Sequence, residues 1–442
     1  GGKWSVLEAA SQPNILFILT DDQRFDSMGC AGNQIITTPN IDQLAKQGVR
    51  FENTFCTTSI CAISRACFML GQYERRHHIN GFRTPYSKEQ LANSFPILLR
   101  KNGYRTGIIG KWGIGGEQPK KEYDYWRGYP GQGRYFPKEK SGVAGEHLTQ
   151  KLESQAIEFL DGCSTKKPFM LQLYTKAAHC QGHEKWQFQP DPKYNDLFKK
   201  TSIPLPKTAT PQHFEALAPF LKTSEARLRW KIRFANEKMR QKSVKDYYRL
   251  IVGIDEMLGK LRAKLKEKGL DKNTIIIFTS DNGFYLGEHG LAGKWFMHEE
   301  SLRLPLIIYN PLLNKKQQGS TTKRFALNID VAPTILDLAG VNTPNVMQGK
   351  SLVPLMEGKT VVWRKDFLYE HRFAYKTIPQ NEGVRGVRWK YVRYTTLSPI
   401  VEELYDLKND PHEEKNLSSD KKYTTKLTEM RKRWRELVKE NE

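Results

Sequence analysis

The sequence predicts an α/β protein with a large, mostly parallel central sheet flanked by helices, and a smaller C-terminal α+β part with an antiparallel sheet. Short apolar runs alternate with helical patterns over most of the chain, as they do in parallel α/β sheets. Polar residues follow several of these runs directly. From about residue 346, apolar and polar residues alternate as in antiparallel strands. We therefore expect a large domain over residues 1–345 and a small α+β subdomain over residues 346–442.

Five apolar runs supply the predicted strands of the large sheet. The clearest cover residues 14–20 and 274–280, and weaker ones cover residues 104–109, 169–174 and 305–309. Asp21-Asp22 and Asp281-Asn282 follow the two clearest runs. In open α/β sheets, ligands bind at the edge where parallel strands end, so this edge is the expected site.

The helical and C-terminal elements follow from periodicity. Apolar residues recur at helical spacing from Val244 to Leu265, which predicts a long amphipathic helix ending near Gly269. Residues 384–394 alternate as paired antiparallel strands, and residues 403–407 predict a further strand before a turn at Asn409-Asp410-Pro411. Residues 423–438 predict a charged terminal helix.

The amino-acid composition excludes some classes of protein and favours others. The 442 residues carry a formal net charge of +22, which favours an anionic partner. An aromatic content of 11% argues against intrinsic disorder. No apolar run reaches the roughly 18 residues of a membrane span. The six cysteines form no C-x-x-C pair. The chain starts Gly1-Gly2 without Met, so we expect a processed or engineered start, from which a signal peptide has been removed.

Two acidic pairs, Asp21-Asp22 and Asp281-Asn282, predict a metal site if their strands are neighbours. Carboxylates packed together repel each other, and a cation would neutralise them. All-oxygen ligation suits Ca²⁺ or Mg²⁺ rather than zinc. Alternatively, Asp21 caps a turn and Asp281 starts an Asp-Asn-Gly turn. Either pair alone favours the turn, whereas the two together favour the metal.

The segment Thr58-Ser-Ile-Cys61-Ala-Ile-Ser64-Arg65-Ala-Cys-Phe-Met-Leu-Gly71 supplies a candidate nucleophile. Cys61 precedes a predicted helix, whose free N–H groups favour anionic ligands. Arg65 follows one helical turn later and could point back towards Cys61. From the residues alone, Cys61 is either a buried structural cysteine or a nucleophile.

This segment resembles the sulfatase signature C-x-P-S-R-x(4)-T-G, with Cys61, Ser64, Arg65 and Gly71 in register and with Ile63 and Leu70 as departures. The resemblance extends over most of the chain. It includes the start at residues 14–22, Thr38-Pro39-Asn40-Ile41-Asp42, Gly110-Lys111-Trp112, Ser280-Asp281-Asn282-Gly283, and residues 287–295 with Gly287-Glu288-His289-Gly290-Leu291 and Lys294-Trp295. The chain is similar to the formylglycine-dependent type I sulfatases of the alkaline-phosphatase-like superfamily, and within them to bacterial enzymes that degrade glycans.

The resemblance implies roles for individual residues. Cys61 would be oxidised to formylglycine by a formylglycine-generating or anaerobic sulfatase-maturating enzyme; one hydroxyl of the hydrate attacks sulfur and the other later expels sulfate. Asp21, Asp22, Asp281 and Asn282 would hold Ca²⁺, with Mg²⁺ as the alternative, and the oxidised Cys61 would join them as a ligand. Arg65 would support the hydrate. Lys111 and Lys294 would contact sulfate oxygens, and His179 would protonate the leaving alcohol.

One departure concerns the base that assists release of sulfate. The family commonly reads Gly-Lys-Trp-His-Leu-Gly, whereas this chain reads Gly110-Lys111-Trp112-Gly113-Ile114-Gly115. The imidazole expected at Gly113 is therefore missing. Either another group, such as His77 or His78, substitutes for it, or release is slower or assisted by solvent.

The resemblance also implies a sulfated carbohydrate substrate, an oligosaccharide or a polysaccharide. Residues 221–250 hold ten Lys or Arg and three acidic residues, which predicts either a solvated helix face or a surface for a polyanion. His77 and His78 are expected at the pocket rim, and His371, Arg372 and Arg385 are expected subsite residues in the small domain. The protein would be periplasmic or secreted, without nucleic acid as a partner.

Two alternatives stay open at this point. A phosphodiesterase or phosphonate monoester hydrolase of the same superfamily shares the metal and formylglycine chemistry. A non-catalytic protein that binds polyanions on a decayed sulfatase scaffold would explain Gly113 and the altered signature. The intact Cys61, Arg65, Lys111 and Lys294 argue against decay.

Overall fold

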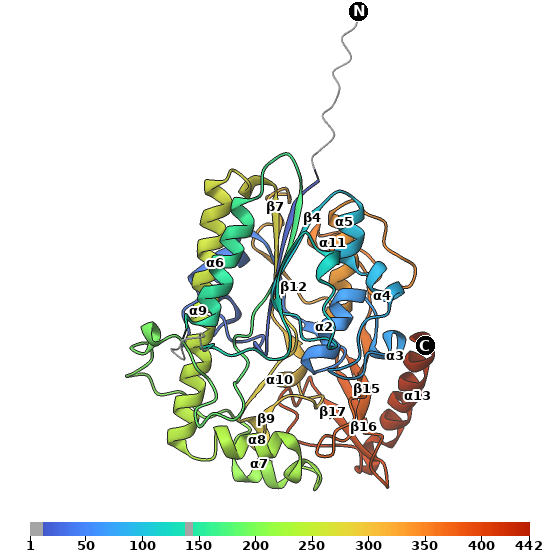
Figure 1. Ribbon diagram of the computed structural model, residues 1–442. Coiled ribbons are helices and arrows are strands. Elements are labelled where there is room, and N and C mark those ends of the chain that lie inside the picture. Colours follow the sequence, from blue (N-terminus) through green and yellow to red (C-terminus); the bar gives the residue numbers. More distant parts are fainter. Residues whose placement is uncertain (1–11, 138–144) are drawn as a thin grey trace, which may run out of the picture.

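The computed structural model describes residues 12–137 and 145–442, and Figure 1 shows its arrangement. The start of the chain, for which we expected processing, lies outside the described residues. Within them, no helix combines the length and the apolar character that a membrane crossing requires.

An eight-stranded sheet forms the centre of the molecule, in the order β12-β2-β11-β7-β1-β6-β4-β5. Its strands are β1 (Asn14–Thr20), β2 (Val49–Phe51), β4 (Arg105–Lys111), β5 (Tyr125–Tyr129), β6 (Phe169–Tyr174), β7 (Thr274–Ser280), β11 (Leu306–Tyr309) and β12 (Ser320–Thr322). The pairs β7-β1, β1-β6, β6-β4 and β4-β5 are parallel, whereas β11 runs antiparallel to both β7 and β2. The predicted parallel centre is confirmed, and the predicted strand at 305–309 forms but runs in the opposite direction.

Helices cover both faces of this sheet, as the continuous apolar character of its central strands requires. Every residue of β1 is buried, and its side chains contribute alternately to two hydrophobic clusters, one on each face. Figure 1 shows α6 and α9 on one face and α2, α5 and α11 on the other. The main helices are α1 (Pro39–Gln47), α2 (Cys61–Leu70), α5 (Phe95–Lys101), α6 (Leu148–Asp161), α8 (Glu225–Arg233), α9 (Glu237–Glu267) and α11 (Val331–Leu338).

Short elements connect these layers. The short helices are α3 (Glu74–His77), α4 (Lys88–Ala92), α7 (Pro211–Glu215), α10 (Glu299–Leu302) and α12 (Val353–Met356). The short strands are β3 (Thr54–Phe55), β8 (Tyr285–Leu286), β9 (Ala292–Gly293), β10 (Arg303–Leu304) and β13 (Ala326–Leu327), which pair in a three-stranded and a two-stranded sheet.

A separate four-stranded antiparallel sheet follows, as the alternating pattern predicts. Its strands are β14 (Asp366–His371), β15 (Asn381–Gly386), β16 (Trp389–Tyr394) and β17 (Val401–Asp406), in sequence order. The terminal helix α13 (Thr424–Glu440) lies along this sheet (Figure 1). The α/β fold with a smaller α+β part is therefore confirmed, whereas the division between residues 345 and 346 stays a prediction.

Candidate active site

Strand register places the two acidic pairs at one edge of the central sheet. Thr20, the last residue of β1, pairs with Ser280, the last residue of β7. Asp21 and Asp281 follow these residues, and the backbone N–H of Asp22 donates to Oδ1 of Asp281 at 3.2 Å. The Asn282 amide donates to Oδ1 of Asp22 at 2.5 Å. The four polar residues therefore lie together, all fully buried or nearly so.

Helix α2 directs Cys61 into this site. The helix begins at Cys61 itself and ends at Leu70; the next residue, Gly71, has a φ of 62°, which suits a residue without a side chain. Sγ of Cys61 lies 3.2 Å from Oδ1 of Asp21 and 2.8 Å from Nζ of Lys294. Lys294 also donates to Asp22. The cysteine at the start of the signature thus faces the carboxylates and a cation.

Two further residues of the signature, Ser64 and Arg65, hold Asp281 in position. The Ser64 hydroxyl donates to the Asp281 carbonyl oxygen at 2.5 Å and accepts from the Asn328 amide at 2.9 Å. Arg65 is fully buried; its Nε donates to Oδ2 of Asp281 at 2.9 Å and its Nη1 to the Lys111 carbonyl at 2.6 Å. Arg65 therefore connects the ends of β7 and β4 and holds a carboxylate in place.

Lys111 and His179 complete the buried cluster. Lys111, the last residue of β4, donates to Asp21 and, at 2.6 Å, to Oε1 of Gln132. Nδ1 of His179 lies 2.5 Å from the Cys180 carbonyl oxygen, and its Nε2 lies 3.6 Å from Oδ2 of Asp22. The predicted catalytic residues Cys61, Arg65, Lys111, His179 and Lys294 thus all lie around the predicted metal residues.

Burial and charge shift the pKa values of these groups in opposite directions. Burial raises the pKa of Asp281 to about 6, and the charge of Asp21 adds to this rise. Burial acts in the same sense on Asp21, but the charges of Lys111, His179 and Arg65 hold the pKa of that carboxyl well below its usual value. Burial, together with Asp21, raises the pKa of the Cys61 thiol well above its usual value.

The cluster fits a hard cation. Oδ2 of Asp22 and Oδ1 of Asn282 are buried and have no hydrogen-bond partner within residues 12–137 and 145–442, although such groups are normally satisfied. Ligand atoms of Asp21, Asp22, Cys61 and His179 all lie within 4.8 Å of one another. With the oxygens of Asp281 and Asn282 beside them, the donor set is mainly oxygen, the type that Ca²⁺ and Mg²⁺ prefer.

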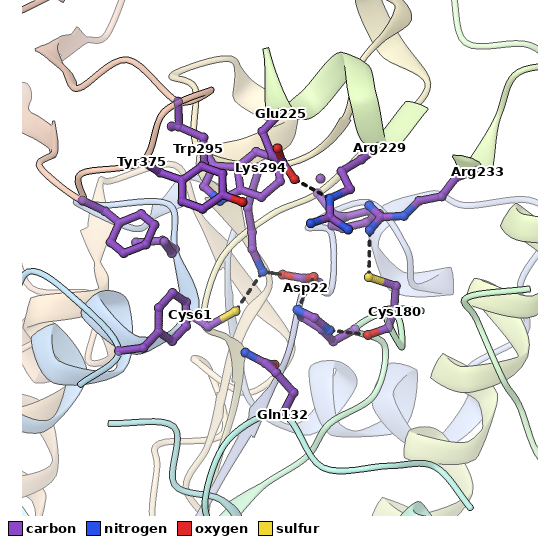
Figure 2. A pocket seen from close by; sticks show the side chains of 18 of the residues that line it. Asp22, Cys61, Gln132, Cys180, Glu225, Arg229, Arg233, Lys294, Trp295 and Tyr375 are labelled. Atoms are coloured by element: carbon purple, nitrogen blue, oxygen red, sulfur yellow. Dashed lines mark hydrogen bonds and ion pairs between the residues drawn. The ribbon is translucent and has the colours of Figure 1, made fainter. Parts of the chain in front are cut away.

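A cavity of about 420 Å³ opens above Cys61, Asp22, His179 and Lys294 (Figure 2). One part of its lining is largely apolar or aromatic and comes from separate segments: Ile60, Phe82, Trp295, Phe373, Tyr375 and Ile378. Another part is polar and includes Gln132, Cys180, His183, Glu225, Arg229 and Arg233. The predicted catalytic residues Cys61, His179 and Lys294 therefore line a cavity large enough for a small ligand.

The predicted substrate residues do not line this cavity. His77 is buried against Sγ of Cys67 at 3.4 Å, and burial lowers its pKa to about 3. His78 is exposed, and Arg372 is exposed beside the cavity residue Phe373. His371 is fully buried, and Arg385 pairs with Glu299 at 3.0 Å. The expectation that these five residues form the rim and subsites is not supported by their positions, and neither His77 nor His78 is placed to replace the imidazole missing at Gly113.

The sequence reasoning missed most of the residues that shape the cavity. Phe82, Phe373 and Tyr375 come from loops or turns, and no pattern marked them. Glu225, Arg229 and Arg233 recur every four residues, a spacing that could have identified one helix face. The basic segment 221–250 is not a uniform outer face, because Arg233, Arg240 and Arg249 within it are buried.

Comparisons with known proteins agree with this geometry. The family model "Sulfatase" matches residues 13–341, and "N-sulphoglucosamine sulphohydrolase, C-terminal" matches residues 287–440. N-acetylglucosamine-6-O-sulfatase of Bacteroides thetaiotaomicron is 32% identical over 96% of this chain and 86% of its own length. Human N-acetylglucosamine-6-sulfatase is 27% identical over 84% of this chain and 69% of its own length.

Solved structures agree as well. A structure described as a complex with its substrate D-glucosamine-2-N,6-O-disulfate has a TM-score of 0.82 and 29% identity, covering 97% of this chain and 98% of the other. The phosphonate monoester hydrolase of Agrobacterium radiobacter has a TM-score of 0.79 at 22% identity, covering 97% and 96%, a likeness of fold alone. The match to the family model over most of the chain, together with the cysteine and carboxylates gathered at its sheet edge, shows that this chain belongs to the sulfatase family and is a hydrolase of sulfate esters.

Proposed function

We propose that the protein removes sulfate from a sulfated carbohydrate, with a formylglycine derived from Cys61 and with Ca²⁺ as cofactor. One observation carries the proposal: Cys61 lines the cavity, and its Sγ contacts both Nζ of Lys294 and the carboxylate of Asp21. The names of the relatives favour a 6-sulfated glucosamine or N-acetylglucosamine unit as the first substrate to test. The enzyme would encounter a sulfated glycan of this kind outside the cytoplasm, so the protein is periplasmic or secreted.

The state of Cys61 supports oxidation of this residue. An unmodified thiol reacts as its thiolate, but burial and Asp21 raise the pKa of Cys61 and keep it neutral. A thiol also has no second oxygen from which to lose a proton. The hydrated aldehyde of formylglycine supplies two hydroxyl groups, one to attack sulfur and one to expel sulfate. A formylglycine-generating or anaerobic sulfatase-maturating enzyme is therefore a required partner.

Asp21, Asp22, Asp281 and Asn282 hold the Ca²⁺, and the unpartnered oxygens of Asp22 and Asn282 support this assignment. The bound ion supplies Lewis-acid stabilisation of charge on the transferred sulfate. Arg65 positions the Asp281 carboxylate through its 2.9 Å hydrogen bond. Mg²⁺ is the alternative ion, with the same oxygen ligands.

Two lysines stabilise negative charge during the reaction, and a histidine donates a proton. Lys294, which lines the cavity beside Cys61, binds a sulfate oxygen as a point charge, and Lys111 adds positive charge from behind Asp21. His179 gives the Nε2 proton of its imidazolium form to the alcohol as the sulfur–oxygen bond breaks, while its Nδ1–H stays bonded to the Cys180 carbonyl. Burial lowers the pKa of His179 well below its usual value, so the negative charge of the bound substrate must stabilise this imidazolium. Water is consumed overall, and the products are the alcohol and inorganic sulfate.

The test is sulfate release by matured protein from N-acetylglucosamine 6-sulfate and a panel of other sulfated saccharides. We expect release from at least one member of the panel, none from the Cys61→Ser variant, and loss of activity with a chelator that Ca²⁺ restores. Equal activity of the wild-type and Cys61→Ser proteins would contradict the assignment of the nucleophile.

A second candidate function is hydrolysis of phosphate diesters or phosphonate monoesters, which the same metal and formylglycine chemistry would serve. An aryl sulfate and an aryl phosphate diester at matched concentrations separate the two functions. A higher kcat/KM on the phosphate diester would favour the second candidate. A protein that binds sulfated polymers without turning over either ester would indicate a decayed scaffold.

A further inference from the structure

Helix α8 presents three charged side chains to the cavity. Glu225, Arg229 and Arg233 are spaced by four residues and therefore share one face of the helix. All three line the cavity, and Figure 2 shows both arginines on the same side of it, across from Tyr375 and Trp295. The mechanism proposed above uses neither arginine.

Arg233 is a buried cation that pairs with no carboxylate in the part of the chain that the structure describes. Only 4% of the residue is exposed. Its Nε donates to Oε1 of Gln187 at 2.8 Å and its Nη2 lies 2.9 Å from Sγ of Cys180, so neither partner is a carboxylate. Its Nη1 is buried and has no hydrogen-bond partner among the described residues. A buried charge without a counter-charge is costly, so this guanidinium is suited to an anion supplied by a ligand.

Arg229 adds a second guanidinium beside the first. Its Nε donates to Oε1 of Glu225 at 2.6 Å, and its side chain is about one-third exposed. Glu225 is itself shared, since its Oε2 accepts from the Thr377 hydroxyl at 2.8 Å. One carboxylate therefore faces two arginines on this helix face, which leaves one positive charge in excess.

The arginines lie next to the reacting groups but apart from the position of the scissile sulfate. Arg233 contacts Cys180, whose neighbour His179 lies 3.6 Å from Asp22. Cys61 and Lys294, which receive the scissile sulfate, contact Asp21 and Asp22 instead. An anion on Arg233 would thus lie on the His179 side of the cavity, where the alcohol part of the ester must lie.

We propose that Arg229 and Arg233 form a second anion subsite, which binds a sulfate or carboxylate group carried by the alcohol part of the substrate. The inference rests on the proposed function, because it assigns the sugar side of the same cavity. The preferred substrate therefore carries at least two anionic groups, of which only one is removed. The aromatic residues Trp295, Phe373 and Tyr375 line the same cavity and provide surfaces for the sugar ring.

The test compares kcat/KM for three substrates: a 6-sulfated glucosamine unit with a neutral N-acetyl group, the same unit with an N-sulfate, and the same unit linked to a uronate. The variants are Arg229→Gln and Arg233→Gln. The control is Lys231→Gln, which removes a charge from an exposed position of the same helix. We expect the wild-type protein to prefer at least one doubly anionic substrate. Each arginine variant should lose roughly ten- to hundredfold on that substrate and less than about threefold on the N-acetyl compound.

The N-sulfate and uronate substrates distinguish the two sources of the anion. Equal losses on neutral and doubly anionic substrates, or a wild-type protein without preference for a second anion, would overturn the proposal. If Arg233→Gln does not fold, Arg229→Gln and Arg233→Lys carry the test, with Arg233→Lys expected to retain more of the preference than Arg229→Gln.

A binding measurement separates this proposal from the proposed function. Calorimetry with glucosamine N-sulfate, which lacks the scissile sulfate, should show binding to the wild-type protein and binding weakened about tenfold or more in Arg229→Gln. Absence of sulfate release from every substrate would contradict the proposed function, whereas absence of this arginine-dependent binding would contradict the subsite.

Discussion

The ammonium nitrogen of Lys294 lies 2.8 Å from Sγ of Cys61. Lys294 also donates to Asp22, so one cation contacts both the residue assigned as nucleophile and a residue assigned to the metal. Its pKa is raised well above the usual value: burial alone would lower it, but the charge of Asp22, with those of Asp21 and Asp281, more than compensates. Lys294 therefore stays charged at neutral pH and is available to an incoming sulfate oxygen.

Replacement of Lys294 by Met should lower kcat/KM for an aryl sulfate by about 10² to 10³, the usual cost of one preorganised donor at developing charge. Lys238→Met, at an exposed position at the start of α9, is the control and should be unchanged. Steady-state kinetics on matured protein provide the measurement. A Lys294→Met protein with wild-type kcat/KM would remove this residue from the site.

Maturation of Cys61 should be visible in the mass of the protein. Oxidation of cysteine to formylglycine lowers the mass by about 18 Da, a covalent change that peptide mass spectrometry detects directly. We expect this loss on the peptide that contains Cys61 after expression with a maturing enzyme, and not in Cys61→Ser. Cys30→Ser is the control and should keep both the mass loss and the activity. An active protein whose Cys61 peptide is unmodified would contradict the requirement for oxidation.

Asp281→Asn should abolish the response to calcium. The substitution removes one negative charge from the oxygen cluster and weakens the hydrogen bond from Nε of Arg65. Binding to the folded state stabilises it, so Ca²⁺ should raise the melting temperature of the wild-type protein and leave that of Asp281→Asn unchanged. Asp196→Asn, at an exposed position, should behave like the wild type. The same calcium shift in Asp281→Asn as in the wild type would exclude this site.

The free energy of unfolding should fall with rising pH because of a buried carboxyl group that is not among the residues assigned to the reaction. Burial, together with Glu288 and Glu413, raises the pKa of Glu300 from 4.5 to about 8. The folded state therefore holds a proton that the unfolded chain releases above about pH 4.5, so this contribution is complete below that pH and is lost as pH rises through 8. Glu300→Gln should match the wild type near pH 5 and melt several degrees higher near pH 9.

The control for this prediction is Glu117→Gln, at an exposed position, which should not alter the pH dependence. Differential scanning calorimetry across this pH range measures the effect. Parallel stability curves for Glu300→Gln and the wild type would show that the Glu300 carboxyl is not protonated in the folded protein.

The sequence predicted those parts of the fold that depend on local pattern. The runs at 14–20 and 274–280 match β1 and β7 residue for residue, because continuous apolar character marks a strand buried on both faces. The direction of β11 was not predictable, since apolar periodicity is the same in parallel and antiparallel strands. The acidic pairs came together because strand register carries them to one edge.

Side-chain direction limited the prediction of the site. His77 ends the short helix α3 and turns inwards to Cys67, and His371 ends β14 with its ring buried, although both were expected at the substrate. Spacing along the chain does not fix where such terminal side chains point. Phe373 and Tyr375 line the cavity because the segment after β14 folds over it, which depends on long-range packing.

The residues of this cavity come from two different parts of the fold. The groups assigned to the reaction come from segments held by the central sheet, whereas Phe373, Tyr375 and Ile378 come from the connection between β14 and β15. That connection can change in length and composition without disturbing the ends of β1 and β7. The same catalytic residues can in this way be combined with cavity walls that suit different sugars. Exchange of residues 372–380 between family members is therefore a direct way to change substrate selectivity.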